Sequence, residues 1–430
     1  MSTPPLRFLR SAKGVVLLSG LIVAGALVPA GVSAQTAFGL KWFGEVRPLS
    51  SPRMLALGGL AAVAPWGREP ATVGLLNPAL MAQAERVLYS FTWELGHLSG
   101  SYPDGEGSLW QSGPRMVGLV LPLGGGVAIG GGLQSHTTSE FEIHKSGEAL
   151  DGVPVRFDYR GTGGLSQGAV GVAWKLPSGV AAVGLEADIL FGSVKQEWSV
   201  DFEPAGYADT SDRLQRQHLG SRWKLGLQLT PTPRIRLGAA VGTRGSMDVK
   251  HIYVTTDAEA DTSEGEARMG GTLLVGMGWL LNDMWALYAD YRQAAWNKME
   301  WVEEPALVGG AGAGATDFSG FSADWDVGIG IERQARPPDE QVTFWDTIPI
   351  RAGLRWGTIY APDLGGGRIS QWYGTLGTAQ PIGREGRAWM DLALVFGGRT
   401  SADAGGATEG FWRIQIGITG AERWFLPPQR

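Results

Sequence analysis

Residues 89–96 read Tyr-Ser-Phe-Thr-Trp-Glu-Leu-Gly, with a large apolar side chain at every second position and a small or polar residue between. Successive side chains of a β-strand point to opposite faces, so this segment would have one apolar and one polar face. The same alternation recurs from Val87 almost to the end of the chain, behind an export signal and without any cysteine. This combination predicts an all-β protein, a transmembrane antiparallel β-barrel that contacts lipid outside and water inside.

The first 34 residues have the features of a cleaved signal peptide. Arg7, Arg10 and Lys13 form a basic start, residues 14–29 are apolar, and the small residues 32–34 form a cleavage site. An apolar run of 16 residues is short for a membrane-spanning helix, and no other run reaches 18. We therefore expect export to the outer membrane of a Gram-negative cell.

Charge and composition exclude several classes of function. Without the signal peptide the chain has 33 basic and 42 acidic residues, a net charge of about −9, and no basic run. Nucleic acid is therefore not an expected partner. The absence of cysteine excludes thiol catalysis and cysteine-based metal sites. The 66 glycines and 18 tryptophans fit curved strands and a membrane–water boundary.

After residue 86 the alternation predicts about 14 strands, an even number of the kind found in bacterial barrels. Short turns alternate with long connections, which we expect to be extracellular loops, at 99–114, 137–164, 199–216, 250–266 and 297–320. Residues 155–159 also alternate and are interpreted as a hairpin extension within a loop. Residues 334–347 form a longer connection than its periplasmic side predicts. The strands are expected near 87–98, 115–123, 127–136, 165–176, 180–198, 217–229, 235–249, 267–281, 285–296, 321–333, 348–360, 369–380, 387–398 and 410–419.

Charged residues on the late strands alternate with apolar ones and should face the lumen. A charge at the lipid midplane costs about 2–4 kcal/mol for Arg or Lys, so this sorting sets the orientation of each strand. One hypothesis is a structural network that pairs the charges and holds an internal segment. The other is that Arg351 and Arg355 bind a carboxylate head group. The remaining members of the expected lumenal network are Asp290, Arg292, Asp324, Asp326, Asp391 and Arg413.

Both ends of the chain carry a recognisable pattern. The N-terminal part has Arg53, the run 58–64 (Gly-Gly-Leu-Ala-Ala-Val-Ala) and Asn77-Pro78-Ala79, while 411–417 read Phe-Trp-Arg-Ile-Gln-Ile-Gly. The chain resembles FadL-type outer-membrane transporters, and the related PorV-type barrels, in these features. Pro65 to Pro70 replaces the acidic stretch usual in that family, and Leu80 replaces a common Gly.

The resemblance implies a domain organisation. Residues 35–86 would fold as a plug inside a barrel of residues 87–425, with a tail at 426–430. It implies a plug motif made of Arg53, Gly58, Gly59, Asn77, Pro78 and Ala79. The apolar plug residues would either contact ligand or only pack the plug; the expected ligand contacts are Leu57, Leu60, Leu76 and Leu80.

Three functions are compatible with the sequence. The favoured one is passive transport of long-chain fatty acids or other hydrophobic molecules, which pass the plug and leave laterally into the membrane lipids. The alternative is a PorV-type component of protein secretion or surface attachment, with a secretion-system protein as partner. A barrel hydrolase would rest on Ser166 in the Gly164–Gly168 motif, but that motif needs a strand, a turn and a helix. We therefore expect no enzyme, no cofactor and no metal.

Overall fold

The computed structural model describes residues 43–47, 50–102, 105–148, 153–202, 208–256, 260–305, 318, 320–336, 343–360, 367–382, 387–401 and 407–422. The expected signal peptide at 1–34, the first residues of the expected plug up to 42, and the tail at 426–430 lie outside these described residues.

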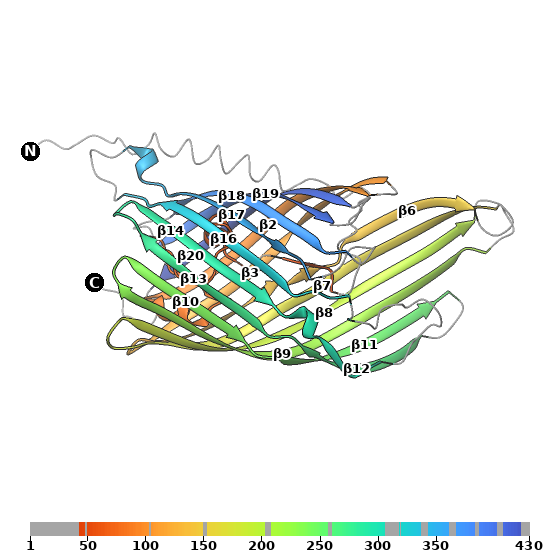
Figure 1. Ribbon diagram of the computed structural model, residues 1–430, viewed down its shortest axis with the longest axis horizontal. Helices are drawn as coiled ribbons and strands as arrows, with labels where there is room; N and C mark the ends of the chain where they lie inside the picture. The colour runs from red at the N-terminus through yellow and green to blue at the C-terminus, as the bar shows by residue number, and fades with distance from the viewer. Residues whose placement is uncertain are drawn as a thin grey trace, which may run out of the picture. The chain divides into compact units, whose positions relative to one another are not determined.

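Within the described residues, eighteen antiparallel strands close into a barrel (Figure 1). Four pairs, namely β4 with β6, β10 with β11, β12 with β13 and β14 with β15, are single strands that are each interrupted once. Fourteen strands therefore surround the lumen, as predicted. The elements are β2 (Val87–Tyr102), β3 (Gly105–Gly124), β4 (Val127–Ser135), β6 (Phe141–Glu148), β7 (Pro154–Lys175), β8 (Ala181–Phe202), β9 (Thr210–Thr232), β10 (Ile235–Gly242), β11 (Gly245–Thr255), β12 (Asp261–Met269), β13 (Thr272–Leu280), β14 (Trp285–Ala294), β15 (Glu300–Glu303), β16 (Asp324–Arg333), β17 (Ile350–Thr358), β18 (Ile369–Ile382), β19 (Ala388–Ser401) and β20 (Thr408–Glu422).

The expected extracellular loops are shorter than predicted, because most of their residues continue the strands. Strand β8 runs to Phe202 and β9 begins at Thr210, so the expected loop at 199–216 is largely strand. Residues 155–159 pair with β6 at the start of the continuous strand β7, so they form one arm of a hairpin that extends the wall and add no further spanning strand. Strands β6 to β9, β11 and β12 extend beyond the rest of the barrel in Figure 1.

The side chains alternate between a lipid face and a lumenal face. On β9, Trp223 and Leu225 are 56% and 57% exposed, whereas Lys224 and Gln228 between and after them are buried. On β17 the outward residues are Leu354 and Trp356, and the neighbouring arginines are buried. Among the described residues, no helix is long and apolar enough to cross a membrane.

The N-terminal segment, residues 50–86, packs against the inward faces of the strands. It contains the short helix α2 (Pro52–Leu55) and the 3-10 helix η1 (Pro78–Gln83). Leu57, Leu60 and Ala62 form an apolar cluster with inward residues of β10, β13 and β14. Ahead of the segment, β1 (Glu45–Val46) pairs with β5 (Thr137–Thr138), the short link between β4 and β6.

Two further features place the ends of the barrel. The connection after β16 lies beside the short turn between β13 and β14, because the Gln334 amide donates to the Met284 carbonyl at 2.7 Å. This connection includes η3 (Phe344–Asp346) and therefore lies at the same end as the tight turns. The η2 helix (Trp296–Lys298) links β14 to β15 near the opposite end of those strands.

Candidate binding cavity and the segment that packs in the lumen

Asn77 connects the N-terminal segment to itself and to the wall. Its Oδ1 caps η1 by accepting from the Ala79 amide at 3.2 Å, which satisfies a donor that the helix leaves open. Its Nδ2 donates to the Ala62 carbonyl at 2.7 Å and to the Leu227 carbonyl of β9 at 3.2 Å. Asn77 is completely buried, so these three bonds account for the local fold around the Asn-Pro-Ala triplet.

Gly58 and Gly59 form a close contact between the segment and the wall. Both have positive φ, +84° and +72°, which favours glycine. A Cβ on Gly58 would lie 2.8 Å from the Ile329 carbonyl oxygen of β16. Arg355 of β17 donates to both carbonyl oxygens, through Nε to Gly58 at 2.6 Å and through Nη2 to Gly59 at 3.0 Å.

Arg351 is the centre of a first buried charge network. It forms ion pairs with Glu332 at 2.8 Å, with Asp391 at 3.1 Å, and with Glu69 of the N-terminal segment. Arg53 of the segment approaches Glu69 at 3.2 Å and Glu332 at 3.5 Å. The network therefore joins the segment to strands β16, β17 and β19, and its charges are paired as burial requires.

Arg355 joins a second network with the acidic residues of β14 and β16. It forms ion pairs with Asp290 and Asp326, and Arg292 pairs with Asp326 at 2.6 Å. Asp290 also accepts from the Ala61 amide of the segment at 2.8 Å. The structure thus brings four of the expected lumenal residues together around the run that begins at Gly58.

A third network holds the residues around β1. Glu45 is buried and pairs with Arg399 and with Arg413, at 2.6 Å for the latter. Burial alone would raise the pKa of Glu45, but the charges of Arg399, Arg47 and Arg413 outweigh it, so the pKa lies well below its ordinary value. The sequence predicts that Arg413 lies in the lumen. It gives no indication that Glu45 of the N-terminal chain pairs with this arginine.

Several members of these networks are not identifiable from the sequence. Glu69 lies between two prolines in a stretch without alternation, and Glu45 belongs to a strand of only two residues. On β8 and β9, Lys224 lies 2.6 Å from Glu186 and 3.0 Å from Asp188, and it donates to the Leu75 carbonyl at 2.8 Å. Alternation places this lysine in the lumen, as the structure does, but it does not show that the acidic partners come from the neighbouring strand β8.

A cavity lies between the segment and the wall, and the centre of a water-sized sphere can move within about 90 Å³ of it. Its apolar lining includes three methionines, and its polar lining includes four basic residues and one acidic residue. A cavity with mostly apolar walls and a few polar groups suits a small ligand. The lining includes Arg47, Leu76, His136, Arg222, Lys224, Met247, Met269, Leu273, Arg292, Met299 and Asp324.

The cavity meets the wall where three neighbouring strands are interrupted at the same height. β10 ends at Gly242, β13 begins at Thr272 and β14 ends at Ala294, and these three residues are in register. The interruptions at 243–244, 270–271 and 295–299 therefore lie side by side. Leu273 lines the cavity, although its side chain is on the lipid face and 37% exposed.

The expected ligand contacts are divided between this cavity and a smaller one. Leu76 lines both, while Leu60 and Leu80 line only the smaller cavity between the segment and strands β3 and β4. Leu57 is fully buried in the apolar cluster with Leu60. Arg351 and Arg355 line neither cavity and are 1% exposed, with carboxylates bound to them.

Two other features of the chain bear on chemistry. The Gly164–Gly168 motif lies inside the continuous strand β7, where Ser166 pairs with Phe191 of β8, so the serine is not on a turn before a helix. Within the described residues, no group of three or more His, Asp or Glu side chains is arranged to hold a metal ion.

Comparison with known proteins identifies the fold. The CymD monoaromatic hydrocarbon channel is similar over 91% of this chain and 99% of its own, with a TM-score of 0.53 and 14% identity. A Pseudomonas aeruginosa FadL homologue gives a TM-score of 0.58 at 12% identity, over 92% of this chain and 99% of its own. For the Ralstonia pickettii toluene transporter TbuX the values are 0.54 and 16%, over 86% and 98%.

These similarities establish the architecture of FadL-type outer-membrane channels, which agrees with the resemblance noted in the sequence. No curated protein matches the sequence. A match to the BamG family extends over residues 30–429, and the chain therefore belongs to the BamG family.

Proposed function

We propose that this protein is an outer-membrane channel for hydrophobic molecules, with the N-terminal segment as a plug and a lateral exit through the interrupted wall. The strongest support for this proposal is that the cavity borders the aligned interruptions of the wall. These interruptions separate β10 from β11, β12 from β13, and β14 from β15. An apolar molecule in the cavity would reach the lipid by passing Leu273, without crossing the polar remainder of the lumen.

The charge networks have a structural role in this proposal. Arg351 and Arg355 fix the plug to the wall through carboxylates and backbone carbonyls, which leaves the cavity as the place where ligand binds. Because buried arginines that are saturated with partners have no donors left for a ligand, we favour the structural hypothesis for both. The alternative, a component of protein secretion, has no need of a cavity that opens toward lipid.

Uptake measurements with a matched pair of variants test the exit. Leu273→Trp would narrow the cavity where it meets the wall, whereas Val275→Trp, two residues along the same face and 39% exposed, does not touch the cavity. Both changes add an aromatic ring that lipid tolerates. The probe is dodecanol, supplied to cells that lack other channels of this type.

We expect Leu273→Trp to slow uptake several-fold and Val275→Trp to leave it at the wild-type rate. Equal uptake by both variants and the wild type would contradict the exit at this position. No uptake above cells without the protein would contradict the channel itself. Heat-modifiable migration on gels confirms that each barrel has folded.

A further inference from the structure

Helix η3 packs on the outer side of the wall, at the end of the barrel that carries the tight turns (Figure 1). Trp285, Arg333 and Ile350 lie directly opposite one another on β14, β16 and β17, and Trp285 and Ile350 are exposed on the lipid face. Because opposite residues of paired antiparallel strands share a face, Arg333 also points outward. Its guanidinium donates to the Trp345 carbonyl of η3 and lies 3.5 Å from Asp346, so η3 is held against the outer face.

Hydrogen bonds give η3 a fixed position. The Arg336 amide donates to the Asp346 carbonyl at 2.7 Å, and the Thr343 hydroxyl donates to a carboxylate oxygen of Asp346 at 2.7 Å. On this fixed turn the side chain of Trp345 is 66% exposed. A tryptophan ring is most favourable at a membrane–water boundary, where one part of it is apolar and the other wet.

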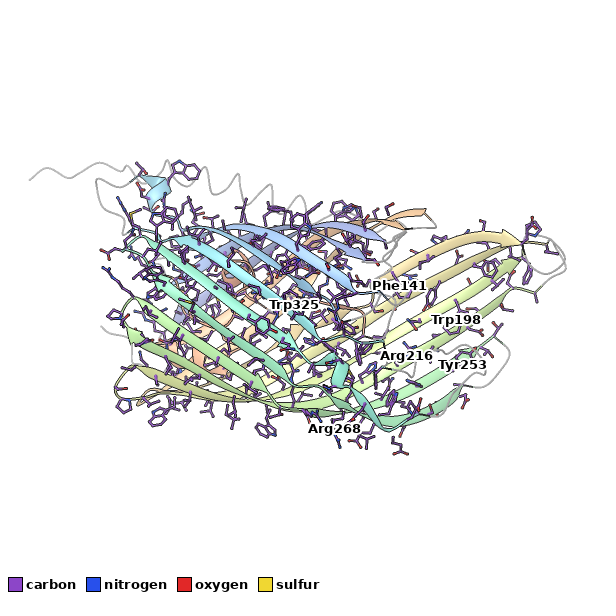
Figure 2. All side chains as sticks on the ribbon, in the orientation of Figure 1. Phe141, Trp198, Arg216, Tyr253, Arg268 and Trp325 are labelled. Carbon is purple, nitrogen blue, oxygen red and sulfur yellow. The ribbon has the colours of Figure 1, made fainter. Side chains whose placement is uncertain are left out.

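The row of Trp285, Arg333 and Ile350 lies at one boundary of the lipid-facing band. Trp325, labelled in Figure 2, is on the same face of β16 toward the other boundary, where its ring packs edge-on against Trp356. The strand between residues 325 and 333 is about 27 Å long, which gives about 21 Å across the membrane at a tilt near 40°, close to the apolar band of about 25 Å. Tight turns of such barrels face the periplasm, so η3 lies at the periplasmic boundary.

Two arginines at this boundary have no carboxylate within hydrogen-bond distance in the part of the chain that the structure describes. Arg336 is exposed, and its Nη2 donates to the thioether of Met284 at 2.8 Å, a weak acceptor. Arg333 has Asp346 at 3.5 Å, and its Nε is buried without a hydrogen-bond partner. A phosphate group would supply the strong acceptors that both guanidinium groups lack.

We propose that η3 and the outer face beside it form a binding site for an anionic phospholipid of the periplasmic leaflet. The phosphate lies between Arg333 and Arg336, the acyl chains follow Trp285 and Ile350, and Trp345 lies at the level of the head groups. The site continues the lipid-facing surface of the barrel, and its two cations against the single carboxylate of Asp346 favour an anionic head group over a zwitterionic one. The proposal concerns a site outside the lumen and does not depend on the channel function.

This site adjoins the strand ends that hold the N-terminal segment. Glu332 precedes Arg333 and Arg351 follows Ile350, and these two inward residues form the buried ion pair at 2.8 Å. A phospholipid bound at the outer row would restrain both strands one residue away from that pair. The position of the N-terminal segment would therefore depend on the lipid composition of the leaflet.

The first test compares two lipids with identical acyl chains, phosphatidylglycerol and phosphatidylethanolamine, bound to the full chain in detergent micelles. Arg336→Gln removes one cation of the site. The matched control is Arg234→Gln, because Arg234 is also exposed and lies at the same end of the barrel, in the turn between β9 and β10. Titration followed by native mass spectrometry measures the affinity of each protein for each lipid.

We expect the wild type to bind phosphatidylglycerol at least about tenfold more tightly than phosphatidylethanolamine. Arg336→Gln should weaken phosphatidylglycerol at least about tenfold, as for hydrogen bonds to a charged group, and Arg234→Gln less than about twofold. Equal affinity of the wild type for the two lipids would overturn the proposal. Equal losses in the two variants would also overturn it, because they would reflect only the general attraction between a basic surface and an anionic lipid.

The second test measures the depth of η3 in nanodiscs that contain phosphatidylglycerol. The chain has no cysteine, so Trp345→Cys carries a single spin label, and the control label is at Asp283→Cys in the exposed turn between β13 and β14. We expect the label at 345 to collide more with oxygen than with a water-soluble nickel complex, and the label at 283 to show the reverse. Equal access of nickel to both labels would place η3 in water and refute the site. Heat-modifiable migration on gels shows that every variant is folded.

Discussion

Arg351 of strand β17 forms a buried ion pair with Glu69 of the N-terminal segment, although the two residues are 282 positions apart in the sequence. Glu332 of β16 and Asp391 of β19 form ion pairs with the same guanidinium. The side chain of Arg351 therefore joins three wall strands and the N-terminal segment at one point.

Replacing Arg351 should be among the most destabilising single changes in the barrel. Arg351→Gln leaves Glu69, Glu332 and Asp391 buried with Arg53 as the remaining cation, and breaking such a group costs about 3–5 kcal/mol. The control is Arg268→Gln, whose partner Glu300 is at 3.0 Å on an exposed surface, with an expected cost of about 1 kcal/mol or less. Urea unfolding in lipid vesicles gives both values, and similar losses would refute the role of Arg351.

The contact of Gly58 with β16 can be separated from its backbone conformation. Gly58→Ala introduces a Cβ 2.8 Å from the Ile329 oxygen at φ +84°, while Gly124→Ala at φ +90° has nothing within 4 Å. The control should cost about 1–2 kcal/mol from its dihedral angle alone. We expect at least about 1 kcal/mol more for Gly58→Ala in urea unfolding, because the N-terminal segment must move away from the wall. Equal costs would mean that the close approach carries no strain.

Asn77 gives a local prediction about the N-terminal segment. Asn77→Ala removes the cap on η1 and both donors to carbonyl oxygens, whereas Asn77→Ser keeps an acceptor for the Ala79 amide. The difference between the two variants should be about 1 kcal/mol, the usual value of such a cap. Hydrogen exchange is the measurement: the Ala79 amide should exchange faster in Asn77→Ala than in Asn77→Ser. Identical exchange in the two variants would show that the cap does not hold η1.

The lowered pKa of Glu45 predicts how stability changes with pH. A carboxyl group whose pKa is lower in the folded state stabilises the fold fully above its unfolded value, near 4.5, and that contribution is lost as the pH falls below it. Between pH 7 and pH 3 this group should account for a loss of about 2 kcal/mol. Glu45→Gln should therefore lose less stability over that range than the wild type.

The comparison must be made as a difference between the two proteins, because other carboxylates titrate in the same range. Urea unfolding at pH 7 and pH 3 supplies the four values. A wild type and a Glu45→Gln variant that lose the same stability would show that Glu45 is not held by Arg399, Arg47 and Arg413 in the folded state.

Sequence periodicity was sufficient for the membrane-spanning part of the fold. An exposed residue at every second position, as in Trp223 and Leu225, has no other explanation in a chain of this kind, and the 14 strands follow from it. Above the membrane the outer face is polar, so residues such as Ser211, Asp212 and Arg213 lose the alternation even though they are in β9. This loss is the reason that the strand extensions were predicted as loops.

The site was less predictable, because its contacts join residues that are remote in sequence. Alternation placed Arg351, Arg355 and Asp290 in the lumen, but it could not show that Glu69 and the Gly58 carbonyl would occupy their donors. Nor could it show the interruption at 270–271, since two glycines within a strand equally suit a bend or a close approach. The transport hypothesis implies an apolar cavity near the N-terminal segment and a gap or bulge in the wall, but nothing in the sequence places that cavity beside Gly270.

The aligned interruptions have a mechanical consequence. Resistance of a sheet to bending comes from its ladder of backbone bonds, and three neighbouring strands lack part of that ladder at one height. The wall should therefore bend most easily along the line of these interruptions. Strands β11 and β12, which extend beyond the rest of the barrel, lie on one side of the line, and the membrane-embedded strands β10 and β13 lie on the other. A force applied to the top of that sheet would be converted mainly into a change in the width of the wall beside Leu273.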